Sequence, residues 1–132
     1  MIFTSLRTIK RALQLSIVVA AISCGEPRQI SGFDSQTWKD DRHGCQGKRA
    51  QIWQQFSAGK GQLMGYSEND LKFLLGKAEK SELMERGQKL YFYDISGSDK
   101  CGKQAADQQP LQLLVRVNSL NKVSEVQAIK PR

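Results

Sequence analysis

The chain has 132 residues, 20 basic and 13 acidic side chains, and a formal net charge of +7. This length allows one hydrophobic core and leaves no room for two. Because no basic run contains interleaved aromatic residues, the sequence argues against a nucleic-acid-binding protein. Part of the basic charge lies in the first 23 residues, which contain three basic and no acidic side chains; residues 24–132 therefore carry 17 basic and 13 acidic side chains, a net charge of +4 that is ordinary for solubility.

The first 23 residues have the pattern of an export signal. Basic residues at Arg7, Lys10 and Arg11 precede an apolar run from Ala12 to Ile22. A charged start, a short apolar stretch and small residues before a cleavage site are typical of a signal peptide. The apolar run spans about 11 residues, whereas a membrane-spanning helix needs roughly 20. We therefore expect residues 1–23 to be removed.

The segment Ala21-Ile22-Ser23-Cys24 resembles the lipobox of bacterial lipoproteins. The resemblance implies that Cys24 receives a diacylglycerol thioether and then an N-acyl chain, such as palmitate. Ala21 stands where that family usually has leucine. The alternative is an ordinary secretory signal cut nearby, which leaves Cys24 as a plain thiol or removes it.

Residues 24–33 predict a flexible tether. The segment is polar and contains Pro27 and two glycines, Gly25 and Gly32. Residues 34–132 lack internal repeats and predict a single α+β domain.

Periodicity predicts a first helix in this domain. Trp38, Arg42, Cys45, Arg49, Ile52 and Phe56 follow one another at spacings of four and three residues, and therefore share one helix face. Gly44 and Gly47 interrupt this stretch and suggest a kink or a close backbone contact beside Cys45.

A second, shorter helix is predicted between Ser67 and Gly76. Ser67 and Asp70 form the pattern of a capping box, and Gly76 is a typical residue just beyond a helix end. Three strands are predicted at residues 90–95, 111–117 and 123–129, and a less certain one at 81–84, since these segments are rich in β-branched and aromatic residues. Asn121 suits a positive φ in a hairpin turn. We expect two helices on one face of a three- to four-stranded antiparallel meander sheet.

The cysteines predict one disulfide. An exported protein meets an oxidising compartment, and once Cys24 carries lipid only Cys45 and Cys101 remain as a pair. A bond between them contributes about 4 kcal/mol at most in the chain-entropy model. It requires the loop of residues 96–110 to fold back over the first helix, and we expect that loop to lie nearest to a partner. The rivals are two free thiols or an intermolecular bridge.

Catalytic and metal sites are not predicted. His43 is the only histidine, and on a helix it points away from Cys45, so we expect an exposed side chain near Asp40 and Asp41. A zinc site needs four ligands, more than His43, Cys45 and Cys101 supply. The residues Asp94 to Asp99 lack the glycine of a calcium loop and predict a solvated loop.

Four side chains allow two interpretations each. Arg42 and Arg49 lie on the inward face of the first helix, where either their stems cover apolar surface or they form an ion pair or an anion site. Trp53 and Tyr66 suit either the core or a contact surface.

Several short motifs resemble the small lipoproteins of the outer-membrane protein assembly machinery, the SmpA/OmlA or BamE-like group. They are Leu74-Leu75-Gly76-Lys77, Tyr91-Phe92-Tyr93 and Val117-Asn118-Ser119, within a similarity that runs from about Tyr66 to Ile129. The resemblance implies a lipidated N-terminus, two helices and an antiparallel sheet. The chain departs from the group's pattern at Asn121 and in having Cys45 and Cys101.

Together these observations predict a non-enzymatic binding or assembly module, lipid-anchored in the bacterial cell envelope. The outer membrane, on its periplasmic side, is favoured because Gly25 is not the aspartate that signals inner-membrane retention in enterobacteria. The expected partners are the membrane and envelope proteins, with no cofactor, nucleic acid or small-molecule substrate. The alternative is a secreted or lipidated small inhibitor or ligand-binding protein on the same scaffold.

Overall fold

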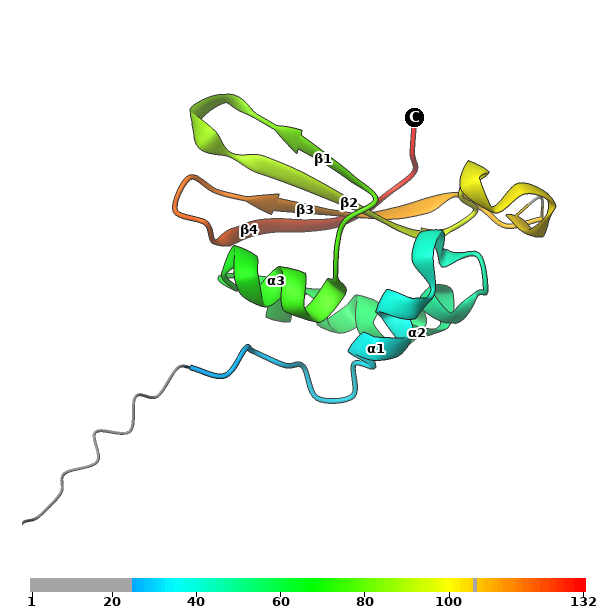
Figure 1. Ribbon diagram of the computed structural model, residues 1–132, viewed down its shortest axis with the longest axis horizontal. Helices are drawn as coiled ribbons and strands as arrows, with labels where there is room; N and C mark the ends of the chain where they lie inside the picture. The colour runs from blue at the N-terminus through cyan, green and yellow to red at the C-terminus, as the bar shows by residue number, and fades with distance from the viewer. Residues whose placement is uncertain (1–24, 106) are drawn as a thin grey trace, which may run out of the picture.

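The structure is a computed structural model that describes residues 25–105 and 107–132. The expected signal peptide, residues 1–23, and the expected lipidation site, Cys24, therefore lie outside the described residues. The described chain has an α+β architecture, with three α-helices on one face of a four-stranded sheet (Figure 1). No helix within the described ranges is long and apolar enough to cross a membrane.

The sheet is an antiparallel meander in the order β1-β2-β3-β4. The predicted strands are confirmed, including the less certain first one; their bounds are β1 (Lys80–Leu83), β2 (Lys89–Ser96), β3 (Leu111–Val117) and β4 (Val123–Ile129). Asn121 has φ 57° in the turn between β3 and β4, as predicted from its tolerance of that conformation.

The prediction of one helix over residues 38–56 is wrong, because the chain breaks it into two. It forms α1 (Ser35–Asp40), a 3₁₀ turn (Arg42–Gly44) and α2 (Lys48–Phe56). His43, Gly44 and Gly47 have φ values of 60°, 67° and 75°, which a right-handed helix does not allow. The two glycines that suggested a kink mark this break.

The break changes which side chains of α2 face the sheet. Trp53 and Phe56 are buried in the core together with Trp38 from α1, whereas Ile52 is only partly buried. Tyr66 is buried as well, so both aromatic residues of uncertain role belong to the core. From the sheet, the side chains that meet them are those of alternate positions on β2 and β3: Tyr91, Tyr93, Ile95, Leu113, Val115 and Val117.

Helix α3 (Glu68–Leu75) forms as predicted. The Ser67 hydroxyl accepts from the Asp70 backbone N–H and the Asp70 carboxylate accepts in return, a complete capping box. Gly76 ends the helix with φ 75°. A 3₁₀ segment (Ser57–Leu63) precedes it and continues from α2.

The expected tether is not free along its whole length. Ile30 is 7% exposed and belongs to the core. The Arg28 backbone N–H donates to Asp70 Oδ1 at 3.2 Å, and its guanidinium lies 5.4 Å from the centre of the Tyr66 ring. Burial of the Ile30 side chain and the contacts of Arg28 with Asp70 and Tyr66 therefore attach this segment to the helix layer.

Candidate functional site

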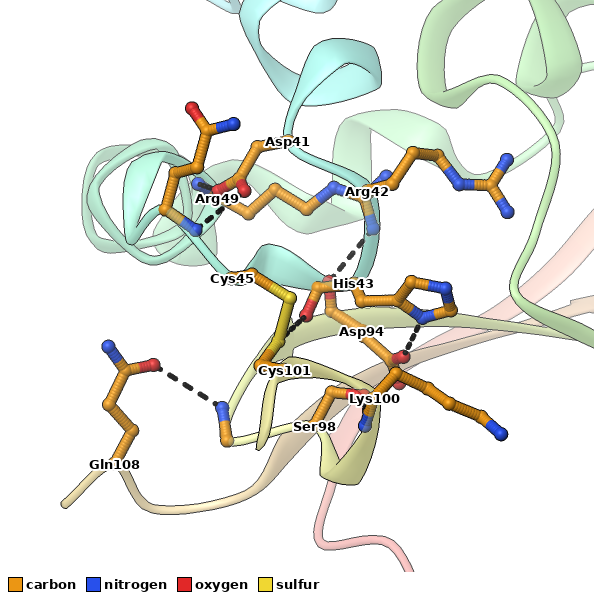
Figure 2. Close-up of a disulfide and its surroundings, with 12 residues drawn as sticks. Asp41, Arg42, His43, Cys45, Arg49, Asp94, Ser98, Lys100, Cys101 and Gln108 are labelled. Carbon is orange, nitrogen blue, oxygen red and sulfur yellow. Dashed lines mark hydrogen bonds and ion pairs between the residues drawn. A yellow bond between two sulfur atoms is a disulfide. The ribbon is translucent and has the colours of Figure 1, made fainter. Parts of the chain in front are cut away.

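The predicted disulfide between Cys45 and Cys101 is present (Figure 2). The two Cα atoms are 5.2 Å apart, within the range that a disulfide requires, and the residues are 56 positions apart in the chain. Cys45 lies between the 3₁₀ turn and α2, and Cys101 lies in a 3₁₀ segment (Asp99–Ala105) of the loop between β2 and β3. The bond therefore fastens that loop to the helix layer.

Two backbone features bring these loops together. Gly44 lies against the backbone of Ile95 on β2, so closely that a Cβ there would collide with the Ile95 carbonyl group. At the base of the loop, the Ser96 hydroxyl donates to the Gln109 carbonyl oxygen at 2.8 Å and closes the loop on itself. The described part of this loop thus folds back onto the 3₁₀ turn (Arg42–Gly44) beside Cys45, as the disulfide prediction required.

Arg49 lies next to the disulfide at the centre of a buried polar cluster, which we define as Trp38, Asp41, Arg49, Glu79 and Asp94. Its side chain is fully buried, and Nη1 donates to Glu79 Oε1 at 2.7 Å and to the Asp94 carbonyl oxygen at 2.9 Å. Nε donates to the Trp38 carbonyl oxygen at 2.8 Å. Of the two interpretations of Arg49, the ion pair is correct.

Asp41 joins the two helical segments within this cluster. Its carboxylate accepts from the backbone N–H of Gln46 at 2.8 Å and from that of Arg49 at 3.0 Å, at the start of α2. Arg42, by contrast, is 48% exposed, and its Nε lies 3.6 Å from Glu79 Oε1 at the edge of the cluster. Only one of the two inward-facing arginines is therefore buried.

The expectation that His43 is exposed near Asp40 and Asp41 is wrong. Its Nδ1 lies 3.0 Å from Asp94 Oδ2, because the left-handed conformation of residue 43 turns the side chain toward β2. The second Asp94 oxygen accepts from Gln112 Nε2 at 2.7 Å. Since Cys45 is part of the disulfide, it offers no thiol for a histidine base to activate. Within residues 25–105 and 107–132, no group of three or more metal-ligating side chains is placed to hold an ion.

A groove of about 910 Å³ runs across the sheet face opposite the helices. Along β2, Tyr91 and Tyr93 face the helices, so Leu90, Phe92 and Asp94 face the groove. Residues 97–99 of the disulfide-bonded loop form one wall, and residues 130–132 contribute as well. The lining contains both acidic and basic side chains, which suits a polar partner; they are Glu82, Asp94, Asp99, Lys80, Lys130 and Arg132. Sequence reasoning missed this groove, although the alternation in β2 was its signal.

A smaller hollow of about 390 Å³ lies on the helix side, between the end of α3 and the sheet. Beside it, Glu68 accepts from Tyr91 Oη, from Lys89 Nζ at 2.8 Å and from Lys72 Nζ at 2.9 Å. Burial alone would raise the pKa of Glu68, but these three donors outweigh it and lower the pKa to about 2. Burial and the neighbouring Glu68 raise the pKa of Tyr91 to about 12, so its hydroxyl remains a donor at neutral pH.

In comparisons with known proteins, no family model, curated protein or solved structure matches the chain.

Proposed function

We propose that the protein is a lipid-anchored binding module of the bacterial cell envelope, held by Cys24 in the outer membrane and supporting outer-membrane protein assembly or envelope integrity. The observation that carries this proposal is the Cys45–Cys101 disulfide. It uses both cysteines of the domain and suits an oxidising compartment, so Cys24, behind a signal-like leader, is the odd cysteine that needs its own chemistry. The α+β architecture is compatible with the resemblance to the SmpA/OmlA or BamE-like group.

In this proposal the groove on the open sheet face receives an envelope protein. Its wall of residues 97–99 belongs to a loop that the disulfide fixes in place, so less conformational entropy is lost when a partner binds. The anchor supplies the location, and the sheet supplies the contact surface.

The anchor is tested by mass spectrometry of the mature N-terminal peptide from bacterial membranes. We expect Cys24 to be the first residue and to carry the mass of a diacylglycerol thioether with an N-acyl chain. A Cys24→Ser variant is the matched control, because it removes the acceptor and leaves the leader unchanged; it should lose membrane attachment. An unmodified Cys24, or cleavage beyond Gly25, would contradict the proposal.

The partner is tested by crosslinking in detergent-solubilised envelopes. Recovery of outer-membrane protein assembly components supports the proposal, and Phe92→Ala in the groove should reduce that recovery while Gln55→Ala, exposed on α2 at the other side of the sheet, should not. The size of the groove also favours a second candidate, a small inhibitor or ligand-binding protein. Recovery of a single soluble target would select that candidate instead.

A further inference from the structure

The two edges of the sheet differ in whether their backbone groups are paired. On the outer edge of β4, the Gly65 N–H donates to the Val123 carbonyl oxygen at 2.9 Å, and the Val123 N–H donates to the Tyr66 carbonyl oxygen at 2.8 Å. The segment that leads into α3 therefore covers the start of β4. The opposite edge is β1, which has β2 as its one neighbour in the sheet.

The ladder between β1 and β2 shows which groups of β1 point outward. The Met84 N–H donates to the Gln88 carbonyl oxygen at 2.7 Å, so Met84 belongs to a hydrogen-bonded pair. Because such pairs alternate along an antiparallel ladder, the N–H and C=O groups of Ser81 and Leu83 point away from β2. Leu83 is 76% exposed and Met84 is 40% exposed, so apolar side chains flank these outward-pointing groups.

The small hollow of about 390 Å³ opens beside this edge. Its seven lining residues include Ser81 of β1, two lysines, Lys72 and Lys77, and two tyrosines, Tyr91 and Tyr93. None of the seven is acidic. The Ser81 side chain lies on the same sheet face as Tyr91, its cross-strand partner, so one residue of β1 belongs both to the free edge and to the hollow.

The surroundings of the hollow are positively charged. Lys72 and Lys89 both contact the single carboxylate of Glu68, and Lys77 adds a third positive charge at the rim. The lining itself carries two ammonium groups, those of Lys72 and Lys77, and no carboxylate, which favours an anionic group in the hollow. The ion pair between Lys80 and Glu82 lies on the opposite, open face of β1 and leaves this face clear.

We propose that β1 binds an extended peptide segment of a partner protein as a fifth strand, with an acidic side chain of that segment in the hollow. The partner residue directly opposite Ser81 has its side chain on the helix side of the sheet, facing Lys72 and Lys77. Backbone hydrogen bonds to Ser81 and Leu83 hold the segment. The positive charges of Lys72 and Lys77 favour an acidic residue at the position opposite Ser81. This site is separate from the groove, so the inference goes beyond the proposed function; it depends on the chain being a binding module but not on its lipid.

The test uses the purified chain of residues 24–132 with its disulfide intact. The probes are a fluorescein-labelled peptide, Thr-Val-Thr-Glu-Thr-Val-Thr, and the same peptide with Gln in place of Glu. We expect the acidic peptide to bind more tightly, with an affinity that falls as salt is added. Hydrogen exchange of the Ser81 and Leu83 amides should slow in its presence. Equal binding of the two peptides, or unchanged exchange at both amides, would overturn the proposal.

Two variants test separately how the lysine charge and the outward backbone groups of β1 contribute to peptide binding. Lys77→Gln should weaken the acidic peptide by about two- to fivefold, the range for a partly exposed ion pair, and leave the Gln peptide unaffected. Lys122→Gln, in the exposed turn before β4, is the matched control and should change neither affinity. Leu83→Pro removes an outward N–H that the sheet itself does not use, and should weaken both peptides. If Lys77→Gln and Leu83→Pro both bind the acidic peptide as tightly as the wild type does, the proposal is also overturned. The N-terminal mass measurement on Cys24 does not depend on these binding results.

Discussion

Arg49 and Glu79 form a buried ion pair at 2.7 Å across 30 positions of the sequence. Arg49 is at the start of α2, and Glu79 is the residue before β1. Glu79 Oε2 also accepts from the Asp94 backbone N–H at 3.0 Å, so one carboxylate joins the helix layer to β2. The pair therefore fixes how the helices sit on the sheet.

Glu79→Gln should destabilise the domain by about 3–5 kcal/mol, because it leaves the buried guanidinium of Arg49 without a counter-charge. The matched control is Glu82→Gln, whose side chain is 40% exposed and pairs with Lys80; we expect a change below about 1 kcal/mol. Urea unfolding followed by circular dichroism measures both. Similar losses for the two variants would show that the interior pair does not hold the domain together.

The sequence predicted the features that depend on neighbouring residues and missed those that depend on distant ones. The capping box of α3 and the turn at Asn121 were predictable because each needs only a few consecutive residues. Arg49 was recognised as inward-facing, but its partner Glu79 lies in a connecting segment with no periodicity of its own. The position of His43 was missed because a non-glycine residue with a positive φ is uncommon.

The broken helix has a different cause. The spacing of inward-facing residues from Trp38 to Phe56 fits one continuous helix, and Gly44 and Gly47 indicated a kink but not two separate helices. Packing of Gly44 against Ile95 on β2 decides otherwise, and this contact is visible only once the sheet is in place. The disulfide was predictable because, with Cys24 assigned to the lipobox-like segment, the count of cysteines left one pair.

Gly44→Ala should be more destabilising than Gly47→Ala. Both glycines have a positive φ, so each alanine costs about 1–2 kcal/mol of backbone strain. At Gly44 the added methyl group also meets the Ile95 backbone, whereas at Gly47 nothing lies within 4 Å. Overpacking adds about 1–3 kcal/mol at Gly44 alone. Thermal unfolding of the two variants gives the comparison, and equal losses would mean that the contact with β2 is unimportant.

The free energy of unfolding should fall as the pH is lowered from about 4.5 to 2. The folded-state pKa of Glu68 is about 2, below its unfolded value of 4.5, so its stabilising contribution is complete above 4.5 and is lost as the carboxylate protonates. Glu68→Gln should lower stability at pH 7 and flatten the curve in this window. Asp34 and Asp70 supply the remaining slope, since hydrogen bonds from Thr37 and Ser67 lower their pKa values.

Urea titrations at half-unit pH intervals test this prediction. Glu85→Gln, in the exposed turn between β1 and β2, is the control and should keep the wild-type pH dependence. A Glu68→Gln curve parallel to that of the wild type would contradict the assignment.

Replacing both Cys45 and Cys101 by alanine should destabilise the domain by up to about 4 kcal/mol, because the unfolded chain regains the freedom of a 56-residue loop. We expect hydrogen exchange to accelerate most in residues 97–103, the loop that the bond fastens. Cys24→Ser, which leaves the bond intact, should have the stability of the wild type. If exchange in the loop is unchanged in the double variant, other contacts hold the wall of the groove.

The packing of Arg28 and Ile30 under the helices has a geometric consequence for a chain acylated at Cys24. Four residue steps separate Cys24 from Arg28, a reach of about 14 Å at full extension. So short a connection would hold Arg28, and with it the α3 residue Asp70 that Arg28 contacts, close to the bilayer. The helices cover one face of the sheet (Figure 1), and the residues that line the groove lie on the other face, so its mouth would point away from the lipid and into the aqueous space. Acylation at Cys24 would thus determine the orientation of the domain as well as the membrane to which it is attached.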